Sequence, residues 1–269
     1  MKDILYKIYK FSNSWTGTII IVLFVIFFIA QAFRIPSGSM KDSLLIGDHL
    51  FAKKFSYGVP MPHLPFIEVS IMPWSDKLKL IDGAEPKRGE IVIFRPPHDH
   101  KTHYVKRCVA LGGDEIFLHD KTLYLHPREG DEYAKKHFSK YELIEIDDKL
   151  WVKNPYVLDF EGIHHDDRVK DDGRFPPELF NMHPIKIADG HYFMMGDNRD
   201  HSNDSRFWGS VPYENLEGTP WFIYFSMDDD YSIRWDRIGK SADTLGGGEY
   251  LERAITERKS SENSEYEFY

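Results

Sequence analysis

The chain contains 269 residues, of which 42% are hydrophobic and 15% aromatic, so it is long enough to form one or two domains with a buried core. The formal net charge of −9 argues against a general nucleic-acid-binding protein, which would carry a basic surface. The single cysteine excludes an internal disulfide and a zinc site built from several cysteines.

The N-terminal segment is apolar and uncharged over a long stretch. No charged residue lies between Lys10 and Arg34, and Trp15–Phe33 is almost entirely hydrophobic. A helix over this range would be about 28 Å long, close to the ~30 Å hydrocarbon core of a bilayer. Because lysines cluster before it, we predict one transmembrane anchor within residues 1–33, with the N-terminus in the cytoplasm and the rest of the chain outside.

Two other interpretations of this segment stay open. Ala30-Gln31-Ala32 has the small-x-small form of a cleavage site, as in a removable signal peptide. A buried core helix is the third alternative, although a helix apolar on all sides needs a larger protein around it. The anchor is favoured because Ala30 directly follows Ile29, which leaves no polar stretch to enter a protease groove. We expect Ala30-Gln31-Ala32 to resist self-cleavage, since a helical segment cannot also lie extended in that groove.

After Arg34 the sequence is typical of a mainly β protein with short strands. Apolar runs separated by turn residues predict strands at His49–Phe55, Glu90–Phe94, Tyr104–Leu111, Glu115–Leu118, Thr122–Leu125, Tyr192–Met195 and Trp221–Phe225. We predict a β catalytic domain from residues 34–125 and 191–240, interrupted by a charged, histidine-rich lobe at 126–190. Residues 241–269 are rich in Ser, Glu and Gly and predict a mobile tail, with one short helix near Tyr250–Glu257.

Two serines follow the apolar segment closely. In Pro36-Ser37-Gly38-Ser39-Met40 the hydroxyls lie on either side of a glycine, which allows close approach of another chain. One serine is a candidate nucleophile and the other a candidate donor to an oxyanion. The simpler interpretation is a turn that links the anchor to the domain.

A lysine lies within an apolar strand. Lys106 is flanked by Val105 and, beyond Arg107, by Cys108 and Val109. An amine pressed against apolar surface loses hydration of its charged form, so its pKa falls and it can take a proton from a serine hydroxyl. The alternative is a solvated lysine on an edge strand. We interpret Cys108 as a small buried residue.

The third unusual stretch is a loop dense in charges and hydroxyls, Gly196–Gly209. Such a loop can hold itself rigid through carboxylate–guanidinium pairs and side-chain-to-backbone hydrogen bonds. A calcium loop is disfavoured, because the spacing departs from the EF-hand pattern and two arginines interrupt it. Histidine-rich stretches at 98–103 and 164–167 are candidate metal sites, but solvated loop histidines are the simpler explanation for both.

Together these residues resemble the bacterial type I signal peptidases, membrane-anchored serine proteases that use a serine–lysine dyad. The order of the motifs matches across most of the chain: the anchor, Pro36–Met40, Gly47–Lys53, Lys106-Arg107, Gly113-Asp114 and the Gly196–Gly209 loop. The family fold is a mainly β domain of twisted antiparallel sheets with a smaller inserted β lobe, which agrees with the pattern of strands.

By position, the resemblance implies that Ser39 is the nucleophile and Lys106 its general base. It implies that the Ser37 hydroxyl and the Ser39 backbone N–H form an oxyanion hole, and that Ser202 orients the lysine amine. The residues expected to brace the site are Asp197, Asn198, Arg199, Asp204 and Arg206. The residues expected to line shallow substrate pockets are Phe33, Ile35, Met40, Leu44, Tyr104 and Val105.

The implied activity is the removal of signal peptides from exported preproteins after small-x-small sites. The expected partners are secretory preproteins and the lipid bilayer, with no nucleic acid, no metal and no organic cofactor, and the protein is expected to be a monomer. The resemblance places it in the bacterial inner membrane as a single-pass protein, with its catalytic domain on the periplasmic side.

Two features depart from the family. Lys41-Asp42-Ser43 follows the candidate nucleophile and its methionine, where relatives commonly have a proline and a threonine; we expect a changed turn and retained activity. Residues 56–80 are longer than expected, and an ordinary extended hairpin is the simplest explanation. Their apolar side chains suggest instead a tip that dips into the outer leaflet: Met61, Phe66, Ile67, Met72 and Trp74.

Three other classes of protein share some of these features. A His-Ser-Asp protease is the nearest, but no Gly-x-Ser-x-Gly elbow is present. A catalytically inactive membrane scaffold would keep the binding features without needing Lys106. A self-cleaving repressor shares the serine–lysine chemistry, but the anchor and the acidic domain argue against a DNA partner.

Overall fold

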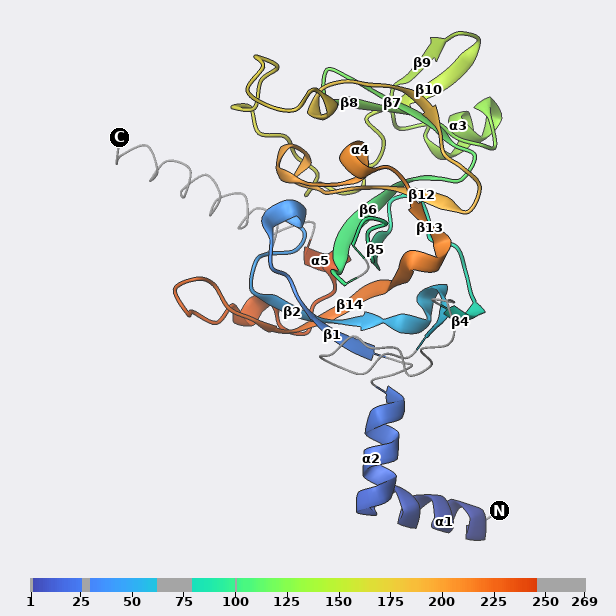
Figure 1. The fold of residues 1–269 in the computed structure, drawn as a ribbon, viewed down its shortest axis with the longest axis vertical. Helices are drawn as coiled ribbons and strands as arrows, with labels where there is room; N and C mark the ends of the chain where they lie inside the picture. The colour runs from blue at the N-terminus through green and yellow to red at the C-terminus, as the bar shows by residue number, and fades with distance from the viewer. Residues whose placement is uncertain (1, 26–29, 62–78, 100, 246–269) are drawn as a thin grey trace.

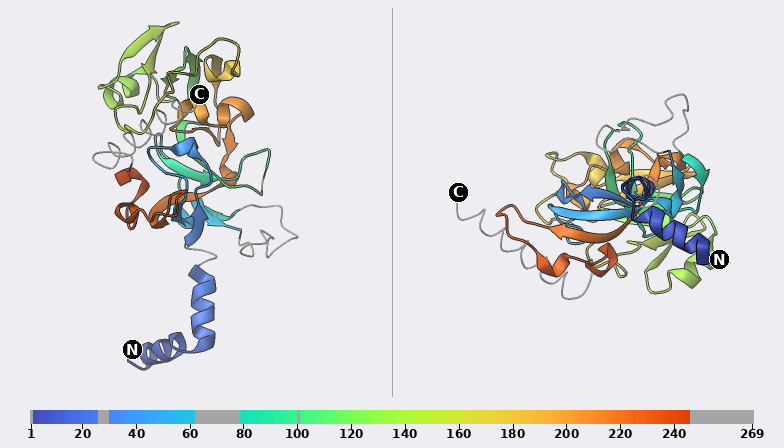
Figure 2. Two further views of the ribbon diagram at one scale, coloured as in Figure 1. Left: turned by 90° about the vertical axis from the view of Figure 1, so that its left-hand side faces the viewer. Right: turned by 90° about the horizontal axis from the view of Figure 1, so that it is seen from below.

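The computed structural model describes residues 2–25, 30–61, 79–99 and 101–245. Two helices, α1 (Lys2–Ser12) and α2 (Trp15–Phe24), precede the β structure. The Ser14 hydroxyl caps α2 by accepting a hydrogen bond from the Gly17 N–H at 3.0 Å. Both helices extend away from the sheets, at the opposite end of the molecule from the second sheet (Figures 1 and 2).

The first sheet has seven strands in the order β1-β2-β14-β5-β6-β12-β13, with antiparallel pairing throughout. Its strands, in chain order, are β1 (Ala30–Arg34), β2 (Asp48–Lys53), β5 (Ile91–Phe94), β6 (Tyr104–Leu111), β12 (His191–Met195), β13 (Val211–Pro212) and β14 (Leu216–Ser226). The prediction of a mainly β fold with antiparallel sheets is confirmed.

The second sheet has five strands in the order β11-β7-β8-β10-β9. They are β7 (Glu115–His119), β8 (Thr122–His126), β9 (Leu143–Ile146), β10 (Lys149–Lys153) and β11 (Met182–Lys186). Helix α3 (Asp131–His137) joins β8 to β9, and a two-stranded sheet pairs β3 (Gly58–Pro60) with β4 (Lys79–Asp82). The second sheet includes β7 and β8, so it begins at Glu115, before the 126–190 segment predicted as a lobe.

The predicted helix over Trp15–Phe33 is wrong at its C-terminal end. Ala30–Arg34 forms β1, which pairs with β2 in register from Ala30 opposite Lys53 to Arg34 opposite His49. Pairing with β2 satisfies the backbone N–H and C=O groups of these residues, which hydropathy alone would place in a helix. Within the described part of the chain, no helix is both long and apolar enough to cross a membrane.

Ala30-Gln31-Ala32 is therefore extended and not helical. Resistance to self-cleavage stays a prediction, but its reason changes. These residues are already paired with β2, so they are not free to bind as a substrate strand. Among the apolar residues at 56–80, Met61 is buried at 3% exposure, while 62–78 lie outside the described residues. Within residues 241–269, predicted as a mobile tail, the described residues contain α5 (Ala242–Leu245), whose Ala242 and Leu245 pack in the core beside Leu44. The helix predicted near Tyr250–Glu257 lies outside the described residues.

Strand β6 lies inside the first sheet, between β5 and β12, and contributes to several parts of the core. Val109 and Ala110 pack toward the second sheet with Ile116 and Phe193, while Cys108 packs with Val92 in a separate cluster. Cys108 is fully buried as predicted. Because β5 pairs with β6 from Tyr104 to Arg107 and β12 pairs with it from Arg107 to Leu111, the side chains along β6 are held at defined depths in the protein.

Candidate active site

Ser39 lies in a short 3-10 turn, Gly38–Met40, that begins four residues after β1 ends. The residue is 7% exposed. Asn198 holds this turn from the other side of the site, because its backbone N–H donates to the Ser39 carbonyl at 3.1 Å and its side-chain amide donates to the Gly38 carbonyl at 3.0 Å. The turn that carries the Ser39 hydroxyl is therefore held by two hydrogen bonds to its backbone, one at Ser39 and one at Gly38.

Lys106 reaches Ser39 from β6. Its Nζ lies 2.5 Å from the Ser39 Oγ, and the residue is only 4% exposed. Burial lowers the pKa of Lys106 to about 8, although the nearby carboxylates of Asp204 and Asp197 oppose the shift. A lysine in this environment is neutral in a useful fraction of molecules near neutral pH, so it can accept a proton from the hydroxyl.

The Ser37 hydroxyl lies 3.5 Å from the Ser39 Oγ, and its residue is exposed in extended backbone just before the turn. Ser202 lies beside the serine turn, since a Cβ on Gly196 would lie 2.3 Å from the Ser202 Oγ and 2.5 Å from the Ser39 carbonyl oxygen. That Ser202 orients the lysine amine stays a prediction. The Ser202 hydroxyl is buried. Burial alone would raise the pKa of the Asp204 carboxyl, but Arg206 is the main group that lowers it, and the nearby Ser202 hydroxyl adds to this effect.

Two buried ion pairs surround the serine and the lysine. Arg107 donates to both oxygens of Asp197, at 2.8 and 2.6 Å, and Arg206 donates to Asp204 at 2.8 Å. Burial alone would raise the pKa of Asp197, but the Arg107 guanidinium and the Ser43 hydroxyl leave it lowered. These carboxylates stay charged because each is paired, which is what a buried charge requires.

The remaining predicted residues lie around the same centre. Arg199 is buried, its carbonyl accepts a hydrogen bond from Arg206 at 2.5 Å, and burial lowers its pKa to about 10. Most of the predicted pocket residues share one cluster beside the Ser39 turn: Phe33, Ile35, Met40, Leu44 and Val105. Tyr104 instead packs with Phe94 and Trp208, although its ring centre is 5.4 Å from Lys106 Nζ.

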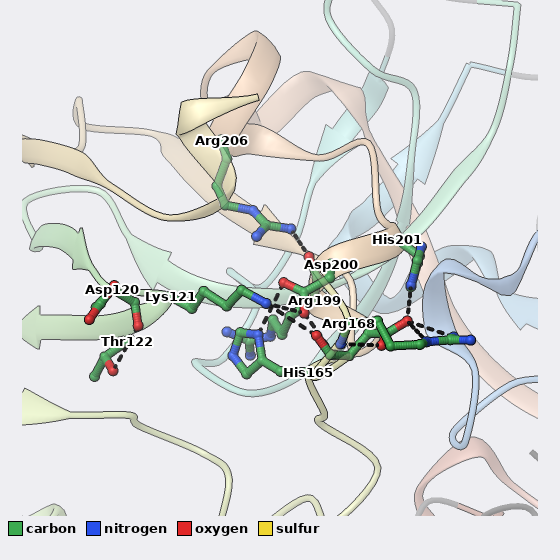
Figure 3. A network of polar contacts seen from close by, with 10 residues as sticks. Asp120, Lys121, Thr122, His165, Arg168, Arg199, Asp200, His201 and Arg206 are labelled. Carbon is green, nitrogen blue, oxygen red and sulfur yellow. Dashed lines mark hydrogen bonds and ion pairs between the residues drawn. The ribbon is translucent and has the colours of Figure 1, made fainter. Parts of the chain in front are cut away.

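The sequence interpretation missed a polar network on the far side of the 196–209 loop. Asp200 accepts from Lys121 Nζ at 2.9 Å and from the Asp166 N–H at 2.7 Å, and His165 lies 3.2 Å from it (Figure 3). His201 contacts the Asp166 carboxylate at 3.0 Å. The network fixes the turn that leads to Ser202. Its only signal in the sequence was the histidine-rich stretch considered as a metal site.

The described histidines of the two candidate metal sites contact carboxylates and aromatic rings. His165 Nδ1 lies 3.2 Å from the Asp200 carboxylate, and His103 Nε2 lies 3.0 Å from the Glu217 carboxylate. His98 packs its ring against Tyr104 and Trp208. Within the described ranges, no three His, Cys, Asp or Glu side chains gather as metal ligands would.

Comparison with known proteins gives a consistent result. The family described as "Signal peptidase, peptidase S26" matches residues 8–225. Signal peptidase I of Helicobacter pylori is 45% identical, over 96% of this chain and 99% of the relative. Signal peptidase I of Pseudomonas fluorescens is 34% identical, over 82% of this chain and 73% of the relative. A signal peptidase I structure from Enterococcus faecalis is 21% identical and covers 51% of this chain and 97% of its own, with a TM-score of 0.32.

The match at this identity extends over nearly the whole length of both chains. It includes the serine turn, the strand that carries Lys106 and the loop that braces them. The chain therefore belongs to the signal peptidase I family, peptidase S26, whose members are serine protease hydrolases that cleave signal peptides.

Proposed function

We propose that this chain is a membrane-anchored endopeptidase that removes signal peptides from exported preproteins, with Ser39 as nucleophile and Lys106 as general base. The observation that carries the proposal is the 2.5 Å separation of Lys106 Nζ from Ser39 Oγ at a buried position. A nucleophile and its base must lie within hydrogen-bond reach, and burial supplies the neutral amine.

The proposed reaction has two stages. Ser39 Oγ attacks the carbonyl carbon of the scissile bond while Lys106 Nζ takes the hydroxyl proton, and the ammonium then gives that proton to the departing amine. The transient oxyanion accepts hydrogen bonds from the Ser39 N–H and the Ser37 hydroxyl, contacts of a kind worth about 3 kcal/mol. Water, deprotonated by the same amine, then attacks the acyl-enzyme and releases the signal peptide with a new carboxylate.

The substrate is proposed to bind as an added strand beside β6. Strand β12 pairs with β6 only from Arg107 to Leu111, whereas β5 pairs along Tyr104 to Arg107. In the described structure, the edge of Tyr104–Lys106 that faces away from β5 is therefore not paired with another strand. A peptide placed there gains main-chain hydrogen bonds beside Ser39. The apolar cluster of Ile35, Met40 and Val105 would then favour small side chains at positions −1 and −3.

The bilayer is the second proposed partner. The apolar residues between Trp15 and β1 are proposed as a single-pass anchor in the bacterial inner membrane, with the N-terminus in the cytoplasm. The catalytic domain would then lie on the periplasmic side as a monomer. Ser39 would lie near the membrane surface, where the cleavage sites of membrane-inserted signal peptides emerge.

The proposal is tested by cleavage of a purified preprotein in detergent micelles. We expect wild type to cleave after a small-x-small site and Lys106→Met to lose roughly 10³-fold or more in rate, since methionine is similar in shape but accepts no proton. Lys149→Met, on the exposed face of the second sheet, is the matched control and should cleave normally. Equal cleavage by Lys106→Met would show that another residue acts as the general base. No cleavage by wild type would reject the proposed function.

A further inference from the structure

Asp42, three residues after Ser39, has an unusual backbone. It is buried at 1% exposure. Its φ of 76° lies in the left-handed region, which residues other than glycine rarely occupy. The turn that contains it is closed by hydrogen bonds from Ser43 N–H and Leu44 N–H to the Met40 carbonyl, at 3.0 and 2.7 Å. A buried, strained aspartate this close to a nucleophile requires a structural reason.

The side chain of Asp42 faces a histidine from a distant part of the sequence. Its Oδ2 lies 3.3 Å from His164 Nδ1, which is also 2.8 Å from the carbonyl of Gly162. The side chain of His164 is only 15% exposed. The same ring nitrogen, Nδ1, therefore faces both the Gly162 carbonyl and the Asp42 carboxylate, and these two oxygens orient the imidazole.

The backbone of His164 is bound to the loop that braces the site. Its N–H donates to the Asp197 carbonyl at 2.9 Å, and its carbonyl accepts from the Arg199 N–H at 3.0 Å. These bonds form a parallel bridge opposite Asn198, the residue that holds the Ser39 and Gly38 carbonyls. These contacts close a ring. Asn198 binds the Ser39 and Gly38 carbonyls, His164 binds the residues on either side of Asn198 and contacts Asp42, and the chain joins Asp42 back to Ser39.

The neighbouring residues leave little space for this ring to shift. A Cβ on Gly162 would lie 2.7 Å from the Ser43 Oγ, and that hydroxyl donates to Asp197 at 2.6 Å. The segment around His164 is therefore pressed against both the serine turn and the bracing loop. Movement of the turn away from this segment would break the contact of Asp42 with His164.

We propose that Asp42 and His164 form a positioning pair that holds the Ser39 turn at the distance from Lys106 that the reaction needs. This inference rests on the proposed function. Neither residue is expected to touch substrate, so losing the pair should lower kcat and leave KM nearly unchanged. A misplacement of about 1 Å can cost roughly 10²-fold in rate, and we expect about tenfold here because Asn198 still holds the turn.

The test is a double-mutant cycle in the full chain in detergent. Asp42→Gly removes the carboxylate while keeping the left-handed turn, and His164→Ala removes the imidazole. We expect each variant to lose about tenfold in kcat, and the double variant to be no worse than the slower single variant. His164→Asn, which places an amide donor near the position of Nδ1, should restore most of the rate. His126→Ala, which removes a similar histidine–aspartate contact in the second sheet, is the matched control.

Multiplicative losses in the cycle, or a change in KM alone, would overturn the proposal. Hydrogen exchange supplies a readout that does not depend on activity. The peptide covering Gly38–Leu44 should exchange faster in Asp42→Gly and His164→Ala than in wild type, and His126→Ala should match wild type. An unchanged exchange rate would reject the pair, whereas an inactive wild type with faster exchange in both variants would reject only the proposed function.

Discussion

The ion pairs around the candidate active site differ sharply from those on the second sheet. The side chains of Arg107 and Asp197 are 2% and 0% exposed, whereas those of Lys149 and Glu115 are 42% and 25% exposed. The contact distances are nearly equal, at 2.6 and 2.7 Å. We therefore expect the buried carboxylate–cation pair to be costly to break and the partly exposed one to be almost dispensable, because water solvates only the second.

The two regions are also held together differently. On the second sheet, Phe117 stacks on Tyr124 with ring centres 4.4 Å apart, and Trp151 packs edge-on against Phe117. Aromatic packing of this kind stabilises a sheet without any buried charge. The candidate site instead buries several charges, and each carboxylate must be paired to stay ionised. Aromatic packing therefore stabilises the second sheet, whereas buried paired charges hold the reactive groups in place.

The largest expected effect comes from removing one charge of a buried pair. Asp197→Asn leaves the Arg107 guanidinium buried without its carboxylate, so we expect a loss of about 3–5 kcal/mol in the free energy of unfolding. Urea titration of the full chain in detergent measures this loss. A change below about 1 kcal/mol would show that the buried pair behaves like a surface pair and would remove the contrast between the regions.

The next effect is on placement. A Cβ on Gly196 would lie 2.3 Å from the Ser202 Oγ and 2.5 Å from the Ser39 carbonyl oxygen, so Gly196→Ala should displace the serine. We expect a loss of about 10²-fold in kcat. Gly130→Ala in the second region meets no atom within 4 Å but keeps a positive φ, so it should lose stability and no activity. Equal activity of both variants would contradict the tight packing at the site.

The pH dependence of cleavage should follow Lys106. Since only the neutral amine accepts the serine proton, kcat/KM should rise about tenfold per pH unit and level off near the folded pKa of about 8. Burial lowers this pKa from 10.5, so the unfolded chain binds more protons between pH 8 and 10.5. The contribution of Lys106 to stability therefore rises with pH in that window. A midpoint near pH 6 would favour a histidine as the base.

The smallest effect is expected on the second sheet. Glu115→Gln removes the exposed partner of Lys149 and should change the free energy of unfolding by less than about 1 kcal/mol, with unchanged cleavage. The same urea titration used for Asp197→Asn measures it. A loss comparable to that of Asp197→Asn would mean that exposure does not explain the difference between the two regions.

Much of the fold could be predicted from the sequence, because strand signals are local. The predicted strand at Tyr104–Leu111 has the bounds of β6, and Thr122–Leu125 differs from β8 by one residue. Ser39 and Lys106 could be proposed because each lies in a distinctive stretch. Asp42, His164 and Asp200 could not be predicted as partners in the site, since their contacts join segments far apart in the chain.

The sequence by itself determined the β pattern, the family and the two candidate reactive groups, because these are set by local periodicity and by motifs. The tertiary structure decided that Ala30–Arg34 is a strand, since only the presence of β2 beside it satisfies that backbone. It also decided that Lys106 is buried and that Asp197, Asp204 and Arg206 surround it. Desolvation and charge pairing depend on what packs against a residue, and that is fixed only when distant segments meet.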